Sequence, residues 1–197
     1  MKYVITISRE YGSGGRFIGK LIAEKMGISF YDSELLTKAS NLSGISQTCL
    51  ENYDETKESA FSYAQGLYGM DMSLGQKVFL AQFDAIKKIA SQESCVIVGR
   101  CADYVLKDNP NVVKVFICAP LEDKIERAVT YYKINPAKAA SIISKKNKKR
   151  RSYYNFYTDK EWGKPDSYDL CINSKNGIET AVEAVCAYTK RRFNLNE

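Results

Sequence analysis

Residues 3–16 read YVITISREYGSGGR, which places a glycine-rich turn directly after a short apolar run. The apolar residues Tyr3–Ile7 show no periodicity, as is typical of a strand buried on both faces. Helical spacing follows over Gly14–Met26, and Gly27 stands where helices commonly end. A strand, a glycine-rich loop and a helix in this order turn backbone N–H groups and a helix N-terminus toward one anion. The stretch therefore predicts a phosphate-binding loop.

Strand-like and helical patterns continue to alternate along the chain. The further predicted strands are Cys95–Val98, Val112–Cys118 and Tyr168–Ile172, and the predicted helices are Leu74–Gln92, a helix with Pro120 at its first position, Pro136–Tyr157 and a helix from Ile178 through Cys186. This alternation predicts an α/β fold with a parallel sheet and right-handed crossovers. No repeat or linker interrupts the pattern, so we expect residues 1–197 to form a single domain.

Cysteine and histidine usage excludes several kinds of site. The chain has six cysteines and no histidine, and no two cysteines form a C-x-x-C pair. This composition disfavours a zinc site and excludes catalysis by histidine. Cys95, Cys118 and Cys171 fall in apolar runs, where we expect them to be buried in a reducing compartment, so we expect a cytoplasmic protein.

We expect neither a membrane anchor nor a secretory leader. No apolar run approaches the roughly 20 residues that span a bilayer. The polar residues 8–10 follow the first apolar run, where a signal peptide would continue with apolar residues and a cleavage site.

The formal net charge of +6 comes from one segment. Its six cations are Lys145, Lys146, Lys148, Lys149, Arg150 and Arg151. Without these six, the remaining 23 basic residues equal the 23 acidic ones. The segment could close over a triphosphate, or it could be a solvated helix face. It could also bind nucleic-acid phosphates, with the aromatic residues in 153–157 as stacking platforms.

The glycine-rich loop departs from the phosphate-binding consensus G-x-x-x-x-G-K-[ST]. When the two are aligned on Gly14, Arg9 replaces the first glycine, Gly15 replaces the lysine and Arg16 replaces the serine or threonine. We expect Arg16 to supply the missing positive charge by reaching back, unless Arg9 supplies it from the other side of the loop.

Six strings spread over nearly the whole chain carry a family resemblance. They are SREYGSGGRFIGKLIAEKMG, FYDSELL, VIVGRCADYVL, VFICAPLEDKIERA, RRSYYNFYTDKEWG and YDLCINS. Together they resemble the cytidylate kinase-like family, which is related to bacterial cytidylate kinases and more distantly to other nucleoside-monophosphate kinases. The resemblance implies a three-layer α/β/α P-loop kinase fold with a five-stranded parallel sheet. It also implies monophosphate-side helices at about 32–73 and a helical lid at about 136–160.

The resemblance assigns roles to particular residues. Asp32 aligns with the segment that opens the monophosphate site, and Arg100 and Asp103 match a motif whose arginine holds the acceptor phosphate. Arg150 matches the lid arginine, and Asn147 stands where the family usually has an aspartate. The expected site comprises Arg16, Arg100 and Arg150 as catalytic residues, Arg9, Gly12, Ser13, Gly14, Gly15, Arg16 and Arg151 at the nucleotide, and Asp32, Arg100 and Asp103 at the acceptor.

The resemblance implies an ATP-dependent phosphotransferase acting on a nucleoside monophosphate or another small phosphorylated acceptor. ATP and Mg²⁺ are the expected cofactors, and Ser13 or Ser8 would replace the missing magnesium hydroxyl. The absent lysine leaves open a nucleotide-binding regulatory protein without turnover, and a nucleic-acid-binding protein is a third, less favoured interpretation. Asp32 could instead be a helix cap, Arg100 could be a surface arginine, and Arg127 could pair with acids of its own helix.

Overall fold

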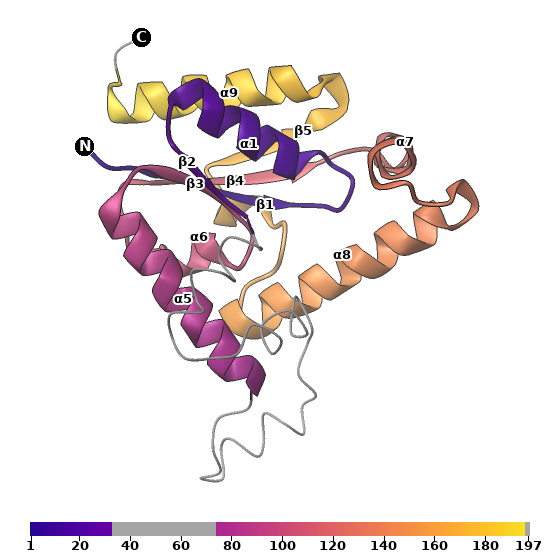
Figure 1. Ribbon diagram of the computed structural model, residues 1–197, viewed down its shortest axis with the longest axis horizontal. Coiled ribbons are helices and arrows are strands. Elements are labelled where there is room, and N and C mark those ends of the chain that lie inside the picture. The colour runs from indigo at the N-terminus through magenta and orange to yellow at the C-terminus, as the bar shows by residue number, and fades with distance from the viewer. Residues whose placement is uncertain (33–73, 196–197) are drawn as a thin grey trace.

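The computed structural model describes residues 1–32 and 74–195. In these residues a five-stranded sheet lies between two helical layers (Figure 1). The strands are β1 (Val4–Arg9), β2 (Ser29–Tyr31), β3 (Cys95–Val98), β4 (Val112–Cys118) and β5 (Leu170–Asn173). Their order is β2-β3-β1-β4-β5, and all neighbouring strands are parallel. The predicted α/β fold with a five-stranded parallel sheet is confirmed, while the helices expected between 33 and 73 lie outside the described residues.

Two helices cover one face of the sheet, α1 (Gly15–Met26) and α9 (Ile178–Phe193) (Figure 1). The helical spacing of Ile18 and Ile22 on α1, and of Val182 and Val185 on α9, places these side chains in one buried cluster. Strand residues of alternating register, such as Ile5, complete that cluster. Burial of this apolar surface fixes both helices over the central strands.

The opposite face carries α5 (Leu74–Gln92) and the short α6 (Ala102–Val105), and α8 (Pro136–Thr158) runs on the same side of the sheet (Figure 1). The helix α7 (Leu121–Tyr132) leads from β4 to α8. Two single 3₁₀ turns, Pro165–Ser167 and Ser174–Asn176, flank β5. No described helix has both the length and the apolar composition needed to cross a membrane.

Several sequence-based expectations need correction. Pro120 precedes α7 in extended geometry, with ψ of 154°, so it is the cap and not the first helical residue. Cys95 is buried as expected, but Cys118 is only partly buried and Cys171, on the edge strand β5, is exposed. β2 and α6 were not predicted from the pattern, since they have only three and four residues. The bounds of α5, β3 and β4 match the prediction.

Because every described strand runs in the same direction, their carboxyl ends meet at one edge of the sheet, where ligands bind in folds of this kind. Glu10, Asp32, Gly99, Ala119 and Ser174 stand at or next to these ends. The loop after β1 lies at the centre of that edge, because β1 is the central strand.

Candidate active site

Two glycines shape the loop between β1 and α1. Gly12 and Gly14 have φ values of +82° and +80°, in the left-handed region that glycine adopts without strain. A Cβ atom on Gly12 would lie 2.7 Å from the carbonyl oxygen of Lys124, so the loop passes directly against α7. Gly14 is the residue before α1, so the first-turn N–H groups of this helix open toward the loop.

The loop is braced from the ends of the neighbouring strands. The Glu10 carboxylate accepts hydrogen bonds from Lys124 Nζ at 2.8 Å and from the backbone N–H of Ala119 at 3.3 Å. The buried hydroxyl of Ser13 donates to the Glu10 carbonyl at 2.9 Å, and the Ser174 hydroxyl donates to the Ser13 carbonyl at 2.7 Å. These bonds hold two loop carbonyls toward the protein and so preorganise the loop for an anion at the helix end.

Arg16 and Asp32 form an ion pair between the start of α1 and the end of β2. Arg16 donates from Nε at 2.8 Å and from Nη2 at 2.6 Å to the same carboxylate oxygen of Asp32. The Asp32 side chain is only 7% exposed, whereas that of Arg16 is 59% exposed. The structure therefore places Arg16 toward the side of the edge on which the acceptor was expected.

A second group of arginines converges beside the loop. Arg9 from β1, Arg100 after β3 and Arg150 from α8 line one small cavity of about 20 Å³. The described lining of this cavity contains no acidic side chain. Its other described residues are Ser8, Gly99, Cys101, Tyr153, Tyr154 and Trp162. Three guanidinium groups at the carboxyl edge of a sheet make a site suited to phosphate oxygens.

The backbone that presents Arg100 is strained. Gly99, Arg100 and Cys101 have φ values of +84°, +56° and +53°, and two of these three left-handed residues carry side chains. Such positions cost about 1–3 kcal/mol each and concentrate at functional sites. Arg100 is only 5% exposed, so it is not a surface arginine. Burial raises the pKa of Tyr153, and the neighbouring Arg100 guanidinium opposes that rise.

A buried hydrogen-bond network joins two residues of the arginine cavity, Ser8 and Tyr154, to Asp103. The Ser8 hydroxyl donates to Asp103 at 3.4 Å, and the Tyr154 hydroxyl donates to the other oxygen of the same carboxylate at 2.6 Å. Burial raises the pKa of Asp103, and the bond from Tyr154 opposes the rise. The pKa of Tyr168 rises to about 12, chiefly through burial. Asp103 is thus enclosed, and it reaches the site through Ser8 and Tyr154.

The middle of α8 docks on the loop. The side-chain oxygen of Asn147 accepts a hydrogen bond from the Tyr11 backbone N–H at 2.7 Å. Arg150 donates to the Arg9 carbonyl at 3.1 Å. The cations of Lys146 and Arg150 lie 5.0 and 5.6 Å from the centre of the Tyr11 ring. The helix predicted as a lid is therefore in contact with the loop.

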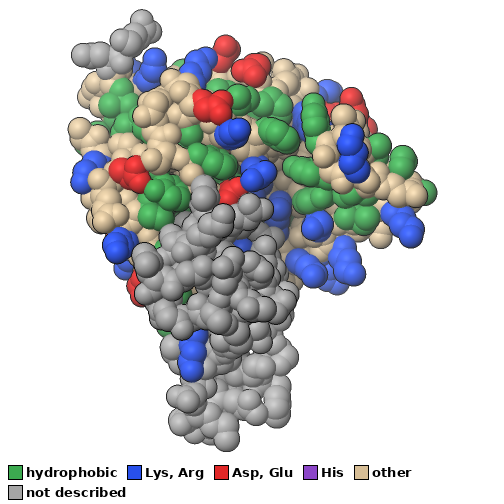
Figure 2. Space-filling model, in the orientation of Figure 1, with side chains coloured by type: hydrophobic (Ala, Val, Ile, Leu, Met, Phe, Trp, Pro, Cys, Tyr) green, Lys and Arg blue, Asp and Glu red, His purple; other side chains and the backbone are tan. Residues whose placement is uncertain are grey.

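The basic side chains of residues 145–151 gather over α8 (Figure 2). Arg151 lies 5.9 Å from the Trp162 ring centre. Tyr153 and Tyr154 are only 6% and 3% exposed. These two rings are therefore unavailable as stacking platforms, which weakens the nucleic-acid interpretation.

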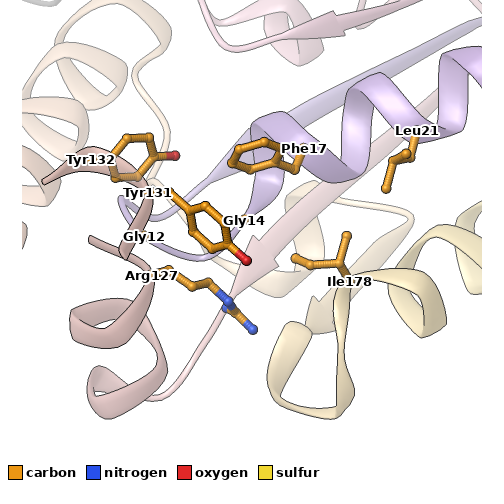
Figure 3. Close-up of a pocket in the computed structure, with 8 residues that line it drawn as sticks. All are labelled: Gly12, Gly14, Phe17, Leu21, Arg127, Tyr131, Tyr132 and Ile178. Atoms are coloured by element: carbon orange, nitrogen blue, oxygen red, sulfur yellow. The ribbon is translucent and has the colours of Figure 1, made fainter. Parts of the chain in front are cut away.

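An apolar pocket of about 240 Å³ lies against the glycine loop (Figure 3). Its lining comes from the loop, α1, α7 and the start of α9: Gly12, Gly14, Phe17, Leu21, Arg127, Tyr131, Tyr132 and Ile178. The Phe17 and Tyr131 ring centres are 5.5 Å apart. Arg127 is held by Ser174, donating to its hydroxyl at 3.0 Å and to its carbonyl at 2.9 Å.

Sequence reasoning did not identify this pocket. Arg127 was expected to pair with acids of its own helix, and it does lie 3.9 Å from Asp123. The signal available in the sequence was the adjacent pair of tyrosines near the end of this helix. In the structure their side chains are 61% and 40% exposed. Only the crossover from β4 to α7 brings Tyr131 and Tyr132 beside the loop.

The described residues suit nucleotide phosphates better than a dedicated metal cage. The loop, the α1 N-terminus and the three arginines match the charge of a triphosphate. No cluster of three metal-ligating side chains occurs within residues 1–32 and 74–195. The Ser8 hydroxyl lines the arginine cavity and bonds the enclosed Asp103, so Ser8 rather than Asp103 would face Mg²⁺ held mainly by phosphates and water.

The sheet order, the glycine loop and the arginine cavity together define an α/β protein of the P-loop kinase type. The chain matches the cytidylate kinase-like family over residues 4–176, and it belongs to this family. It is 28% identical over 123 residues to the cytidylate kinase of Methanosarcina barkeri, covering 62% of this chain. The match spans 59% of that relative's length.

Solved structures show the same fold. A crystal structure of an uncharacterized protein from Eubacterium ventriosum has 30% identity and a TM-score of 0.76, with 96% of this chain and 99% of that one covered. A gluconokinase from Sinorhizobium meliloti has a TM-score of 0.57 at 14% identity, covering 96% of this chain and 92% of that one. The second likeness concerns the fold alone.

Proposed function

We propose that this protein is an ATP-dependent phosphotransferase that acts on a nucleoside monophosphate or another small phosphorylated acceptor. The observation that carries the proposal is the convergence of Arg9, Arg100 and Arg150 beside a glycine loop and a helix N-terminus. Phosphoryl transfer needs mainly positioning and charge stabilisation, which such a site can supply. Membership of a kinase-like family supports the same reaction class.

The nucleotide would lie along the loop. Gly12, Ser13, Gly14 and Gly15 would offer backbone N–H groups to the phosphates, and the apolar pocket would take the base. A pocket of about 240 Å³ suits part of a nucleotide rather than the whole. Arg150 and Arg151 would close over the triphosphate from α8.

The acceptor would lie on the opposite side of the arginine cavity. Arg100 would hold its phosphate, while Asp32 and Arg16 would mark the end of β2 that faces the acceptor. An oxygen of the acceptor phosphate attacks the γ-phosphorus, and the bond from that phosphorus to the β,γ-bridging oxygen breaks. ADP leaves with the electron pair. The attacking oxygen is already largely deprotonated at neutral pH, so no protein base is required.

Mg²⁺ entering with ATP would neutralise negative charge on its phosphates. We propose that Ser8, oriented by Asp103, helps to hold its water shell, since the usual hydroxyl position is occupied by Arg16 and the Ser13 hydroxyl bonds Glu10. The whole chain would act as one domain in the cytoplasm, with residues of about 136–160 as the lid.

A second candidate is a nucleotide-binding regulatory protein without turnover. Gly15 favours it, because no lysine stands at the position that usually reaches the β- and γ-phosphates.

A two-stage experiment tests the proposal. Thermal unfolding is first measured with ATP, ADP and AMP, each with and without Mg²⁺; a ligand at 100 times its Kd stabilises the fold by about 2.7 kcal/mol. ADP formation is then measured with a panel of nucleoside monophosphates and with sugar phosphates. ATP-dependent stabilisation with transfer to one acceptor supports the kinase. Stabilisation without transfer to any acceptor supports the regulatory alternative, and no stabilisation by any nucleotide overturns both.

A further inference from the structure

The space in which a side chain at position 15 would start is already filled. A Cβ atom placed on Gly15 would lie 2.6 Å from Cβ of Arg9 and 3.0 Å from its Cγ. Those distances are shorter than carbon–carbon contacts allow. Gly15 is the first residue of α1 and aligns with the lysine of the phosphate-loop consensus. The stem of Arg9 therefore lies where the stem of that lysine would begin.

The far end of the same side chain lies against a second glycine. A Cβ atom on Gly99 would collide with Nη1 of Arg9 and would lie 3.0 Å from its Cζ. Gly99 directly follows β3, the strand beside β1. The Arg9 side chain thus runs from the start of α1 across the strand ends, with its guanidinium in the cavity that Arg100 and Arg150 also line.

Arg16 is directed differently. Two of its nitrogens bond the Asp32 carboxylate, at the end of β2, whereas Arg9 lies between β1 and β3 in the cavity beside the loop. Of the two arginines that flank the glycine loop, Arg9 is the one that shares the space of the missing lysine.

We infer that Arg9 supplies the charge that lysine supplies in other phosphate loops, and that Gly15 and Gly99 are glycines because Arg9 lies across them. This inference rests on the proposed function, since it assigns the group that meets the β- and γ-phosphates. Arg9 acts through a planar guanidinium that can bind two phosphate oxygens at once, whereas an ammonium is a point charge. The positive charge thus comes from Arg9, six positions before the position at which the consensus has its lysine.

Binding of ATP and of inorganic tripolyphosphate to purified full-length variants tests the charge. Arg9→Gln keeps the stem that packs over Gly15 and removes the charge, and we expect a loss of at least tenfold in affinity for both ligands. Arg191→Ala removes an exposed arginine on α9 and should bind like wild type. The double variant Arg9→Gly/Gly15→Lys should recover binding relative to Arg9→Gly, because removal of the Cβ and Cγ of Arg9 gives the lysine stem room. Wild-type affinity in Arg9→Gln, or no recovery in the double variant, overturns the assignment.

A cycle of unfolding temperatures tests the packing without any ligand. Gly15→Ala should lower the melting temperature in the wild-type background, because its Cβ meets Arg9. The same change should not lower it in the Arg9→Gly background, which lacks the Cβ at position 9 and where alanine is the better helix residue. Equal effects in the two backgrounds contradict the shared space.

The two proposals can fail separately. Arg9-dependent binding of ATP without transfer to any acceptor supports the inference and removes the kinase function. Transfer that is unchanged in Arg9→Gln supports the kinase function and removes the inference. Wild-type protein that binds neither ATP nor tripolyphosphate overturns both.

Discussion

Asn147 in the middle of α8 accepts a hydrogen bond from the backbone N–H of Tyr11 in the phosphate loop, at 2.7 Å. Residues 136 positions apart are thus joined where nucleotide phosphates are proposed to bind. An amide side chain at position 147 accepts this bond without adding negative charge beside the phosphate site, whereas an aspartate would add one.

Replacing Asn147 by alanine should free the Tyr11 amide and loosen α8 from the loop. We expect faster hydrogen exchange at Tyr11 and a loss of about 1 kcal/mol in unfolding free energy, the usual value for one hydrogen bond. Amide exchange measured by NMR checks this, with Lys148→Ala on the exposed side of α8 as the control. Unchanged exchange at Tyr11 would show that the contact does not persist in solution.

Arg150 and Arg151 should differ in effect although they are neighbours. Arg150 contacts the loop carbonyl of Arg9, whereas Arg151 lies over Trp162. We expect Arg150→Ala to weaken triphosphate binding about tenfold or more, equivalent to about 1.4 kcal/mol, and Arg151→Ala to weaken it less. Isothermal titration with ATP distinguishes them. An equal loss in both variants would favour a diffuse electrostatic role for the whole basic segment.

Tyr154→Phe should destabilise the protein more at pH 7 than at pH 4. The folded pKa of Asp103 lies above its unfolded value, so the unfolded state binds fewer protons and this group's contribution falls as pH rises above about 4. The Tyr154 hydroxyl stabilises the carboxylate, and its removal should cost about 1–3 kcal/mol where Asp103 is charged. Urea unfolding at both pH values measures this, with exposed Tyr131→Phe as the control. A difference that grows toward low pH would contradict the assignment.

Tyr131→Ala should separate base binding from phosphate binding. Tyr131 lines the apolar pocket and is 61% exposed, so its removal should change stability by less than about 0.5 kcal/mol. We expect weaker binding of ATP and unchanged binding of inorganic tripolyphosphate. Leu121→Ala, exposed at the other end of α7, is the matched control. Equal loss for both ligands would place the base elsewhere.

Arg16→Ala should raise the KM for the acceptor more than it changes the affinity for ATP. Its partner Asp32 is nearly buried, so loss of this ion pair should lower the unfolding free energy. Because Arg16 itself is well exposed, we expect a loss of only about 1 kcal/mol. Steady-state kinetics with each substrate varied in turn gives the split. If ATP binding disappears instead, Arg16 rather than Arg9 meets the triphosphate.

The sequence predicted the elements whose pattern is long. Leu74–Gln92 and Val112–Cys118 were bounded correctly because buried helices and strands leave a periodic or continuous apolar signal. Ser29–Tyr31 leaves no such signal, since three half-buried residues form the edge of the sheet. The position of Pro120 depends on a single ψ angle that the pattern does not encode.

The site was predictable as a set of residues but not as an arrangement. Arg9 and Arg16 both flank the glycine loop in sequence, and residue type alone could not assign one to Asp32 and the other to the cavity. Side-chain direction differs because Arg9 ends a strand and Arg16 lies in the first turn of a helix. The left-handed geometry of Arg100 likewise had no local signal, because arginine seldom adopts it.

The helix α8 is one unbroken element of 23 residues, about 35 Å long at 1.5 Å per residue. Buried residues occur near both of its ends, Ala139 and Ile143 in the first half and Tyr153 and Tyr154 in the second. A helix that packs against the protein near both ends cannot swing open about one end as a hinged lid does. Closure of this lid over a nucleotide would then come from side chains between these two packed ends, such as Arg150, with the helix backbone staying in place. Substrate access would be gated on the timescale of rotamer changes rather than of domain movement.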